Sequence, residues 1–221
     1  MTPMKKITLA FLLLAAAVPV RADDPAPKTI LFLGDTFVAG YGVTPSETMP
    51  AQIADRVAAA GLPFTVINAG ESGEDSAAAL QRAQELFQQH HVDVLVLFVG
   101  ANDGLRQASI SDLEHNLVYI IYRARKSNPR MRILFLGVRM PAEMGAYARR
   151  FNEIYPRIAY RRRIAILPWV LEGIMGELDL TLADHMHPNE RGFKLMADRV
   201  WPGLESILRK SMADPPPKPK K

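Results

Sequence analysis

Short apolar runs alternate along the chain with longer segments in which apolar residues recur every three or four positions. Most of the short runs end in glycine, asparagine or another turn-forming residue, as buried strands of a parallel sheet do. The run at 92–99 is nearly continuous, which is typical of a central strand covered on both faces. The pattern predicts five strands, at residues 29–33, 64–67, 92–99, 132–136 and 164–167.

The longer segments have the period of amphipathic helices. In the first of them, Ile53 and Val57 lie four residues apart on one face. Ser111 and Glu114 have capping-box spacing and predict the start of the third helix. Pro156 predicts a kink or a break inside the fourth. The predicted helices cover residues 49–60, 75–89, 111–128, 146–160 and 190–209.

Strands that alternate with helices predict a parallel sheet made of βαβ units. We therefore expect an α/β fold, a three-layer α/β/α sandwich with a five-stranded parallel sheet between two helical layers. The chain shows no internal repeat and no linker in its middle, so we predict one domain over residues 29–210. A hydrophobic fraction of 48% is ample for the core of such a domain.

The two ends of the chain depart from this pattern. Lys5 and Lys6 precede an apolar stretch at 7–20, whose 14 residues are too few for a comfortable membrane span. We expect residues 1–22 to be a cleaved secretory signal, which predicts a periplasmic or secreted bacterial protein without a stable membrane span. An uncleaved N-terminal anchor is the alternative. We also expect a short linker and a disordered tail rich in proline and lysine, at 23–28 and 211–221.

Charge and cysteine content exclude some classes of function. The formal net charge is +4, from 27 basic and 23 acidic side chains. Six of the basic residues lie in the terminal segments, and removing them leaves 21 against 23, so the body is close to neutral. A nucleic-acid-binding domain needs a clustered basic face, so we do not expect nucleic acid as a partner. The absence of cysteine excludes disulfides and thiolate metal sites.

Residues suited to chemistry follow three of the predicted strands. Thr36 comes after the first strand, Gly73 after the second and Asn102 after the third. Because the carboxyl ends of parallel strands meet at one edge of a sheet, we expect these residues to lie together. Thr36 offers a hydroxyl, and the Gly73 N–H and the Asn102 amide can donate to a developing oxyanion. Taken alone, Thr36 could also cap the helix that follows it.

A fourth segment supplies an acid–base pair. Asp184 and His187 are three residues apart, just before the last helix. In a tight turn, a carboxylate at this spacing holds one imidazole nitrogen while the other faces the cleft, which orients a general base for a hydroxyl nucleophile. Two alternatives are open. Ser72 is a rival hydroxyl, although it does not lie in a Gly-x-Ser-x-Gly elbow. His185 could pair with His187 on a metal, but no third ligand is evident.

Four sequence blocks in this order resemble the SGNH/GDSL hydrolase family: GDTFVAGYG, NAGESGEDSA, GANDGLR and DHMHPN. More narrowly, they resemble its exported bacterial arylesterase, acyl-thioesterase and lysophospholipase members. The resemblance covers essentially the whole mature domain. It implies a flavodoxin-like fold, no metal or organic cofactor, and a small ester, thioester or lysolipid substrate.

The resemblance also implies a role for each candidate residue. Thr36 takes the place of the nucleophilic serine, and its backbone N–H is one donor of the oxyanion hole. Gly73 and Asn102 match the other two donors. His187 matches the catalytic base, and Asp184 matches the acid that orients it.

The departure from the family pattern is threonine in place of serine. Threonine keeps a hydroxyl but adds a methyl group, which restricts χ1 and must fit beside the oxyanion hole. Two hypotheses follow. The first is a hydrolase that cleaves esters or thioesters through Thr36. The second is a catalytically impaired relative that binds an acyl or glycan ligand or a protein partner.

Overall fold

The computed structural model describes residues 26–213. The predicted signal segment at 1–22 lies outside the described residues, as do residues 214–221 of the predicted tail, so these assignments stay predictions. The predicted start of the tail at residue 211 is wrong, because the last helix continues to Met212 and Ser211 is buried. Within the described part, no helix combines the length and the apolar character needed to cross a membrane.

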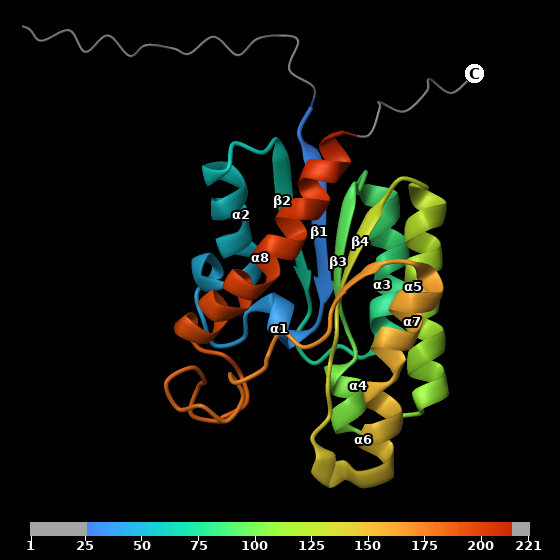
Figure 1. Cartoon of the computed structure of the whole chain (residues 1–221), viewed down its shortest axis with the longest axis vertical. Helices are drawn as coiled ribbons and strands as arrows, with labels where there is room; N and C mark the ends of the chain where they lie inside the picture. The colour runs from blue at the N-terminus through green and yellow to red at the C-terminus, as the bar shows by residue number, and fades with distance from the viewer. Residues whose placement is uncertain (1–25, 214–221) are drawn as a thin grey trace, which may run out of the picture.

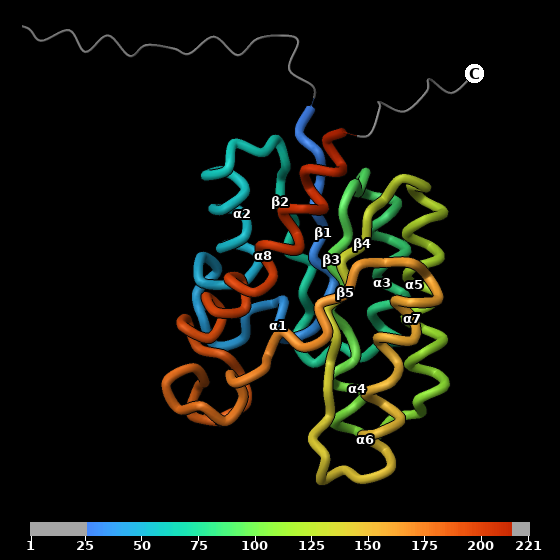
Figure 2. The backbone as a smooth tube through the Cα atoms, in the orientation of Figure 1, coloured from blue at the N-terminus to red at the C-terminus, as the bar shows by residue number. Residues whose placement is uncertain are grey.

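Five parallel strands form the centre of the molecule, in the order β2-β1-β3-β4-β5 (Figures 1 and 2). Their bounds are β1 Lys28–Gly34, β2 Phe64–Gly70, β3 Val94–Phe98, β4 Arg132–Leu136 and β5 Ala165–Leu167. The central strand β3 is buried throughout, whereas the edge strand β2 also carries exposed residues. The predicted five-stranded parallel sheet is confirmed, and its strand order is the flavodoxin-like one.

Two layers of helices cover the sheet, as Figure 1 shows. On one face, α2 (Met49–Ala59) packs against α8 (Glu190–Met212). On the other face, α3 (Ser76–Gln89) packs against α5 (Ile110–Ser127), and α7 (Ile154–Arg162) lies next to α5. The predicted α/β/α sandwich is therefore confirmed.

Shorter helices lie in the connections: α1 (Thr36–Ala39), η1 (Pro45–Glu47), α4 (Ala101–Leu105), η2 (Ala142–Met144) and α6 (Gly145–Asn152). Two of them, α1 and α4, are separated from the ends of β1 and β3 by one and two residues, in segments for which the sequence pattern predicts turns and loops. Helices of this length are too short to show a hydrophobic period. Both lie at the carboxyl edge of the sheet, where the candidate residues are.

Capping and strand pairing place some helix and strand ends at other residues than the sequence pattern predicts. β2 continues to Gly70 because it pairs with β1 along its whole length, as far as Gly34. The cap of α5 is Ser109, whose hydroxyl accepts a hydrogen bond from the N–H of Asp112. The predicted capping box that starts at Ser111 is therefore wrong by two residues.

The segment that contains Pro156 is broken, as predicted. α6 ends at Asn152 and α7 begins at Ile154, so that Pro156 lies in the first turn of α7. A proline is tolerated there because the N–H that it lacks would have no partner within the helix.

Candidate active site

Thr36 is the first residue of α1, separated from the end of β1 by Asp35 alone. The helix starts there because the side chain of Asp35 accepts a hydrogen bond from the Phe37 N–H, at 3.1 Å. It ends after four residues because Gly40 adopts a φ of 84° and donates its N–H to the Thr36 carbonyl. Since Asp35 caps the helix, the alternative role of Thr36 as the cap is wrong.

The loop after β2 brings Gly73 to Thr36. The Gly73 N–H donates a hydrogen bond to Thr36 Oγ1, at 3.1 Å. Gly73 has a φ of +80°, and a Cβ added there would meet nothing within 4 Å, so backbone conformation and not space favours glycine. The start of the loop is held by the Glu71 N–H, which bonds to the Gly34 carbonyl at 3.0 Å. The hydroxyl of Thr36 therefore already lies beside a backbone donor.

Asn102 lies in the first turn of α4. Its side-chain amide donates to the carbonyl oxygen of Glu74, the residue after Gly73, at 2.9 Å. An asparagine amide carries two hydrogens, so one donor remains for a ligand. Asn102 thus ties α4 to the loop that carries Gly73.

The carboxylate of Asp184 makes three hydrogen bonds, two of them with His187. Asp184 Oδ2 lies 2.6 Å from His187 Nδ1, and Asp184 Oδ1 accepts the N–H groups of Met186 and His187 at 2.9 Å each. The side-chain bond to His187, followed by these backbone bonds, lowers the pKa of Asp184 to about 2. A charged carboxylate on Nδ1 leaves Nε2 as the nitrogen able to accept a proton.

His187 lies against the first turn of α1. Its ring centroid is 5.9 Å from that of Phe37, the residue after Thr36, and 4.8 Å from that of Tyr41. Among the hydrogen bonds of residues 26–213, none joins Thr36 to His187. Hydrogen bonds between nucleophile and base are often long before substrate binds. The structure therefore gathers the five candidate residues at one edge of the sheet, with Thr36 and His187 near each other but not bonded.

The two alternative site residues lie at the surface. Ser72 is exposed, and its side chain makes no hydrogen bond with any described residue. His185 is exposed and has a φ of 56°. In the described part of the chain, no group of three or more His, Cys, Asp or Glu side chains is placed to hold a metal ion, so His185 has no ligand set to join.

Arg82 of α3 supports the site in a way that sequence reasoning missed. Its guanidinium bonds to the carboxylate of Glu74, and also to the carbonyl oxygens of Ala69 and Gly34, at 2.8 and 3.4 Å. One side chain therefore ties together the ends of β1 and β2 and the loop that carries Gly73. No sequence signal marks it, because Arg82 has the spacing of an ordinary exposed helix residue.

A second support lies under α4. The buried carboxylate of Asp103 accepts the N–H of Ser76 at 2.9 Å and its hydroxyl at 2.6 Å. Asn116 of α5 donates to the same hydroxyl, at 2.9 Å. Asp103 thus fixes α4, and with it Asn102, to the start of α3.

The contact between β2 and α1 is tight at Gly70. A Cβ added to Gly70 would lie 2.1 Å from the backbone nitrogen of Ala39, so α1 would have to shift. We expect Gly70→Ala to lower the free energy of unfolding by about 1–3 kcal/mol, measured by urea unfolding. The matched control is Gly203→Ala in α8, where an added Cβ meets nothing within 4 Å, and it should not destabilise. Equal stability of wild type and Gly70→Ala would contradict the close packing.

Asp35 is a buried acid beside Thr36. It is 1% exposed, and its Oδ2 has no hydrogen-bond partner in the described residues. Burial raises the pKa of Asp35 from 3.8 to about 7. Between these pH values the folded protein keeps a proton that the unfolded chain releases, so the free energy of unfolding falls as the pH rises. Above pH 7, the free energy of unfolding is lower than at pH 4 by an amount of the order of 4 kcal/mol, at about 1.4 kcal/mol for each pH unit between the two pKa values.

The variant Asp35→Asn should lose this pH dependence, because an amide cannot ionise and can still cap α1. We expect its free energy of unfolding, relative to wild type, to rise by roughly 1–4 kcal/mol between pH 4 and pH 8. Urea unfolding at both pH values measures the difference. Asp112→Asn, at an exposed position in α5, is the control and should show no such rise. If the difference in the free energy of unfolding between Asp35→Asn and wild type is the same at both pH values, the effect is refuted.

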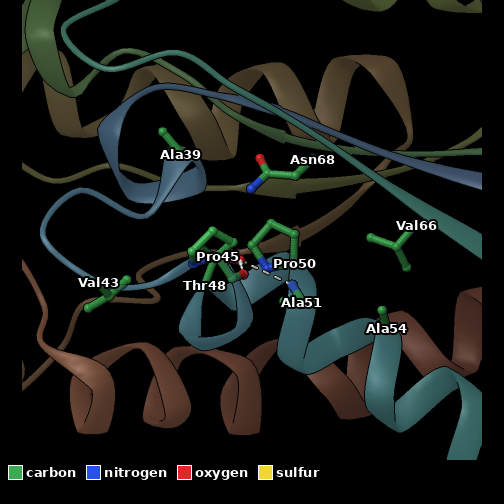
Figure 3. A pocket seen from close by; sticks show the side chains of 9 residues that line it. All are labelled: Ala39, Val43, Pro45, Thr48, Pro50, Ala51, Ala54, Val66 and Asn68. Atoms are coloured by element: carbon green, nitrogen blue, oxygen red, sulfur yellow. Dashed lines mark hydrogen bonds between the residues drawn. The ribbon is translucent and has the colours of Figure 1, made fainter.

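A cavity of about 340 Å³ lies between the end of α1, the start of α2 and the edge strand β2 (Figure 3). Ala39, Val43, Pro50 and Val66 give it an apolar lining, and Asn68 adds a polar group. None of the five candidate residues lines it. The candidate active site is therefore separate from this cavity.

Comparison with known proteins supports one family. Residues 32–195 match the model of the GDSL-like lipase/acylhydrolase family. The chain is 31% identical over 193 residues to esterase TesA of Pseudomonas aeruginosa, covering 87% of this chain and 95% of the relative. It is 32% identical over 187 residues to thioesterase 1/protease 1/lysophospholipase L1 of Escherichia coli, covering 83% and 86%.

Solved structures agree with this relationship. The crystal structure of TesA has a TM-score of 0.77 at 31% identity, over 81% of this chain and 99% of that one. The psychrotrophic esterase EstA from Pseudoalteromonas sp. also has a TM-score of 0.77, at 27% identity, over 82% and 99%. The resemblance found in the four sequence blocks is thus confirmed along the whole domain. The chain belongs to the GDSL-like lipase/acylhydrolase family.

Proposed function

We propose that this protein hydrolyses carboxylic esters or thioesters through the hydroxyl of Thr36. The observation that carries the proposal is the hydrogen bond of 2.6 Å between Asp184 and His187, which holds the imidazole beside the first turn of α1. Membership in a family of lipases and acylhydrolases supports the same class of reaction.

In the proposed mechanism, His187 Nε2 takes the proton of Thr36, and Thr36 Oγ1 attacks the acyl carbonyl. The N–H groups of Thr36 and Gly73 and the amide of Asn102 hold the oxyanion of the tetrahedral intermediate. His187 gives the proton to the leaving group and then activates the water that releases the acid. Asp184 stays charged at neutral pH, because its pKa is about 2, and stabilises the imidazolium.

Small esters, acyl thioesters or lysolipids are the proposed substrates. The names of two relatives support this range, since one is an esterase and the other a thioesterase and lysophospholipase. The mechanism needs no metal or organic cofactor. The signal-like composition of residues 1–22 supports export to the periplasm or beyond.

The test is the hydrolysis of short p-nitrophenyl esters and acyl thioesters, with a p-nitrophenyl phosphonate as a covalent label of the nucleophile. We expect turnover, and we expect the label on the tryptic peptide that contains Thr36. Ser72 lies in a different tryptic peptide, because Arg56 separates the two. Ser72→Ala is the control and should keep its activity within about twofold. Label on Ser72 would contradict the proposal.

A second candidate function is the binding of an acyl or glycan ligand or of a protein partner without turnover. The observation in its favour is the methyl group of Thr36, which lies where the family carries only a serine hydroxyl. Ligand binding without hydrolysis in the same substrate panel would support it.

A further inference from the structure

A second pocket lies at the opposite end of the sheet from Thr36. It has a volume of about 550 Å³ and is lined by residues at the starts of β4 and β5 and near the ends of α5, α7 and α8. In Figure 1 the red end of α8 marks this end of the sheet, and α1 and α4 lie at the other. The length of β1, about 20 Å at 3.3 Å per residue, separates the two ends. This pocket is therefore not part of the candidate active site.

The lining of this pocket is strongly basic. No aspartate or glutamate is among the described residues that line it. Its charged residues are cations that come from distant parts of the sequence: Arg125, Arg130, Arg132, Arg163 and Lys210. Five positive side chains thus surround one concavity.

This concentration does not reflect a general excess of positive charge. When the six cations and three carboxylates of residues 1–25 and 214–221 are set aside from the totals of 27 and 23, 21 basic and 20 acidic side chains remain. Five of those 21 cations nevertheless line this one pocket. The expectation that the body lacks a clustered basic surface is therefore wrong at this end of the molecule.

Three of the five cations have side-chain N–H groups that make no hydrogen bond within residues 26–213 and can donate to a ligand. The side chains of Arg163 and Lys210 make no hydrogen bond or ion pair with another residue of 26–213. Arg125 donates one N–H to the carbonyl oxygen of Arg162, at 2.7 Å, and its guanidinium has further N–H groups. Some other arginines of the described part are paired with carboxylates, as in Arg56–Asp198 and Arg157–Glu114.

The floor of the pocket is apolar. Met131, Ile133 and Ile207 line it, and each is more than nine-tenths buried. An apolar floor strengthens the attraction between a guanidinium and an anion, because it lowers the local dielectric constant. Three helices also end here, and the partial negative charge of about half a unit at each C-terminus reduces the repulsion among the cations. These partial charges together are smaller than the three positive charges of Arg125, Arg163 and Lys210 alone, so the pocket stays positive and favours an anion.

We propose that this pocket binds a phosphate group. Guanidinium groups form paired hydrogen bonds with phosphate oxygens, and the Lys210 ammonium adds a compact charge. The pocket volume leaves room for an organic group attached to the phosphate. The bearer is a soluble phosphate or the headgroup of a phospholipid, since both present the same chemistry. The site does not depend on ester hydrolysis at Thr36, so either proposal can fail without the other.

The test compares the full chain with two double variants of equal net charge. Arg163→Gln/Lys210→Gln removes two cations of the pocket. Arg149→Gln/Arg150→Gln is the control, because it removes two exposed cations of α6 that do not line the pocket. One arm measures inorganic phosphate binding by calorimetry at constant ionic strength. The other arm measures co-sedimentation with vesicles of phosphatidylglycerol, against vesicles of phosphatidylcholine.

We expect wild type and control to bind at least one probe, and the pocket variant to bind it roughly tenfold more weakly or worse. Binding of inorganic phosphate supports a soluble ligand, and binding of phosphatidylglycerol vesicles alone supports a lipid headgroup. Equal weakening in both double variants would overturn the proposal, because it would show general attraction between charges. Failure of wild type to bind either probe would also overturn it. Thermal unfolding of all three proteins verifies that each is folded.

Discussion

Replacing His187 by alanine is expected to lower kcat for ester hydrolysis about a thousandfold or more, with little change in KM. His187 is the base in the proposed mechanism, and its ring lies against that of Phe37, next to Thr36. Without it, the Thr36 hydroxyl keeps its proton and the leaving group receives none. Initial rates with a p-nitrophenyl ester, corrected for spontaneous hydrolysis, measure the loss.

His185→Ala is the matched control for this experiment. His185 lies in the same turn, is exposed and makes no side-chain hydrogen bond with a described residue, so its removal should leave kcat within about twofold. Asp184→Asn should also lower kcat strongly, and combining it with His187→Ala should add little, because the pair acts as a unit. A His187→Ala protein as active as wild type would refute the mechanism.

Most of the fold could be predicted from the sequence because strands and long helices carry repeated apolar positions. The short helices α1 and α4 could not be predicted, since the start of each depends on the side chain or the backbone conformation of a single residue. The Asp35 carboxylate caps α1, and Gly100 opens α4 with a φ of 119°. The break in the segment with Pro156 was predictable because proline lacks the N–H that the interior of a helix requires.

The candidate site was predictable for a topological reason. Thr36, Gly73 and Asn102 follow three parallel strands, and such strand ends meet at one edge of a sheet. Asp184 and His187 are close in sequence, so their spacing alone indicated a pair.

The supports of the site and the basic pocket could not be predicted, because they join residues that are distant in sequence. Arg82 contacts three separate segments, which no local pattern reveals. Arg125, Arg163 and Lys210 come from the ends of three helices that meet only in the folded protein. A count of charges over the whole chain does not reveal such a cluster, because the carboxylates elsewhere balance its positive charges.

Replacing Thr36 by serine is expected to raise kcat roughly ten- to a hundredfold, with KM nearly unchanged. Thr36 is 8% exposed, and its Oγ1 accepts a hydrogen bond from Gly73 but makes none with His187. To attack, the hydroxyl has to align with the imidazole, and the methyl on the same carbon has to turn with it in a nearly closed space. Serine has no such methyl, so its hydroxyl aligns without displacing neighbours.

Thr36→Ala sets the background in this comparison, since it removes the hydroxyl and leaves the rest of the site in place. Wild-type turnover above that background, with serine faster still, means that threonine is a working but hindered nucleophile. Wild-type turnover equal to the background, with only Thr36→Ser active, means that the native protein is a binding relative that lost hydrolysis through one methyl group. If the serine variant is no faster than an active wild type, the prediction is wrong, and the site accommodates the methyl without cost because its surroundings fit threonine.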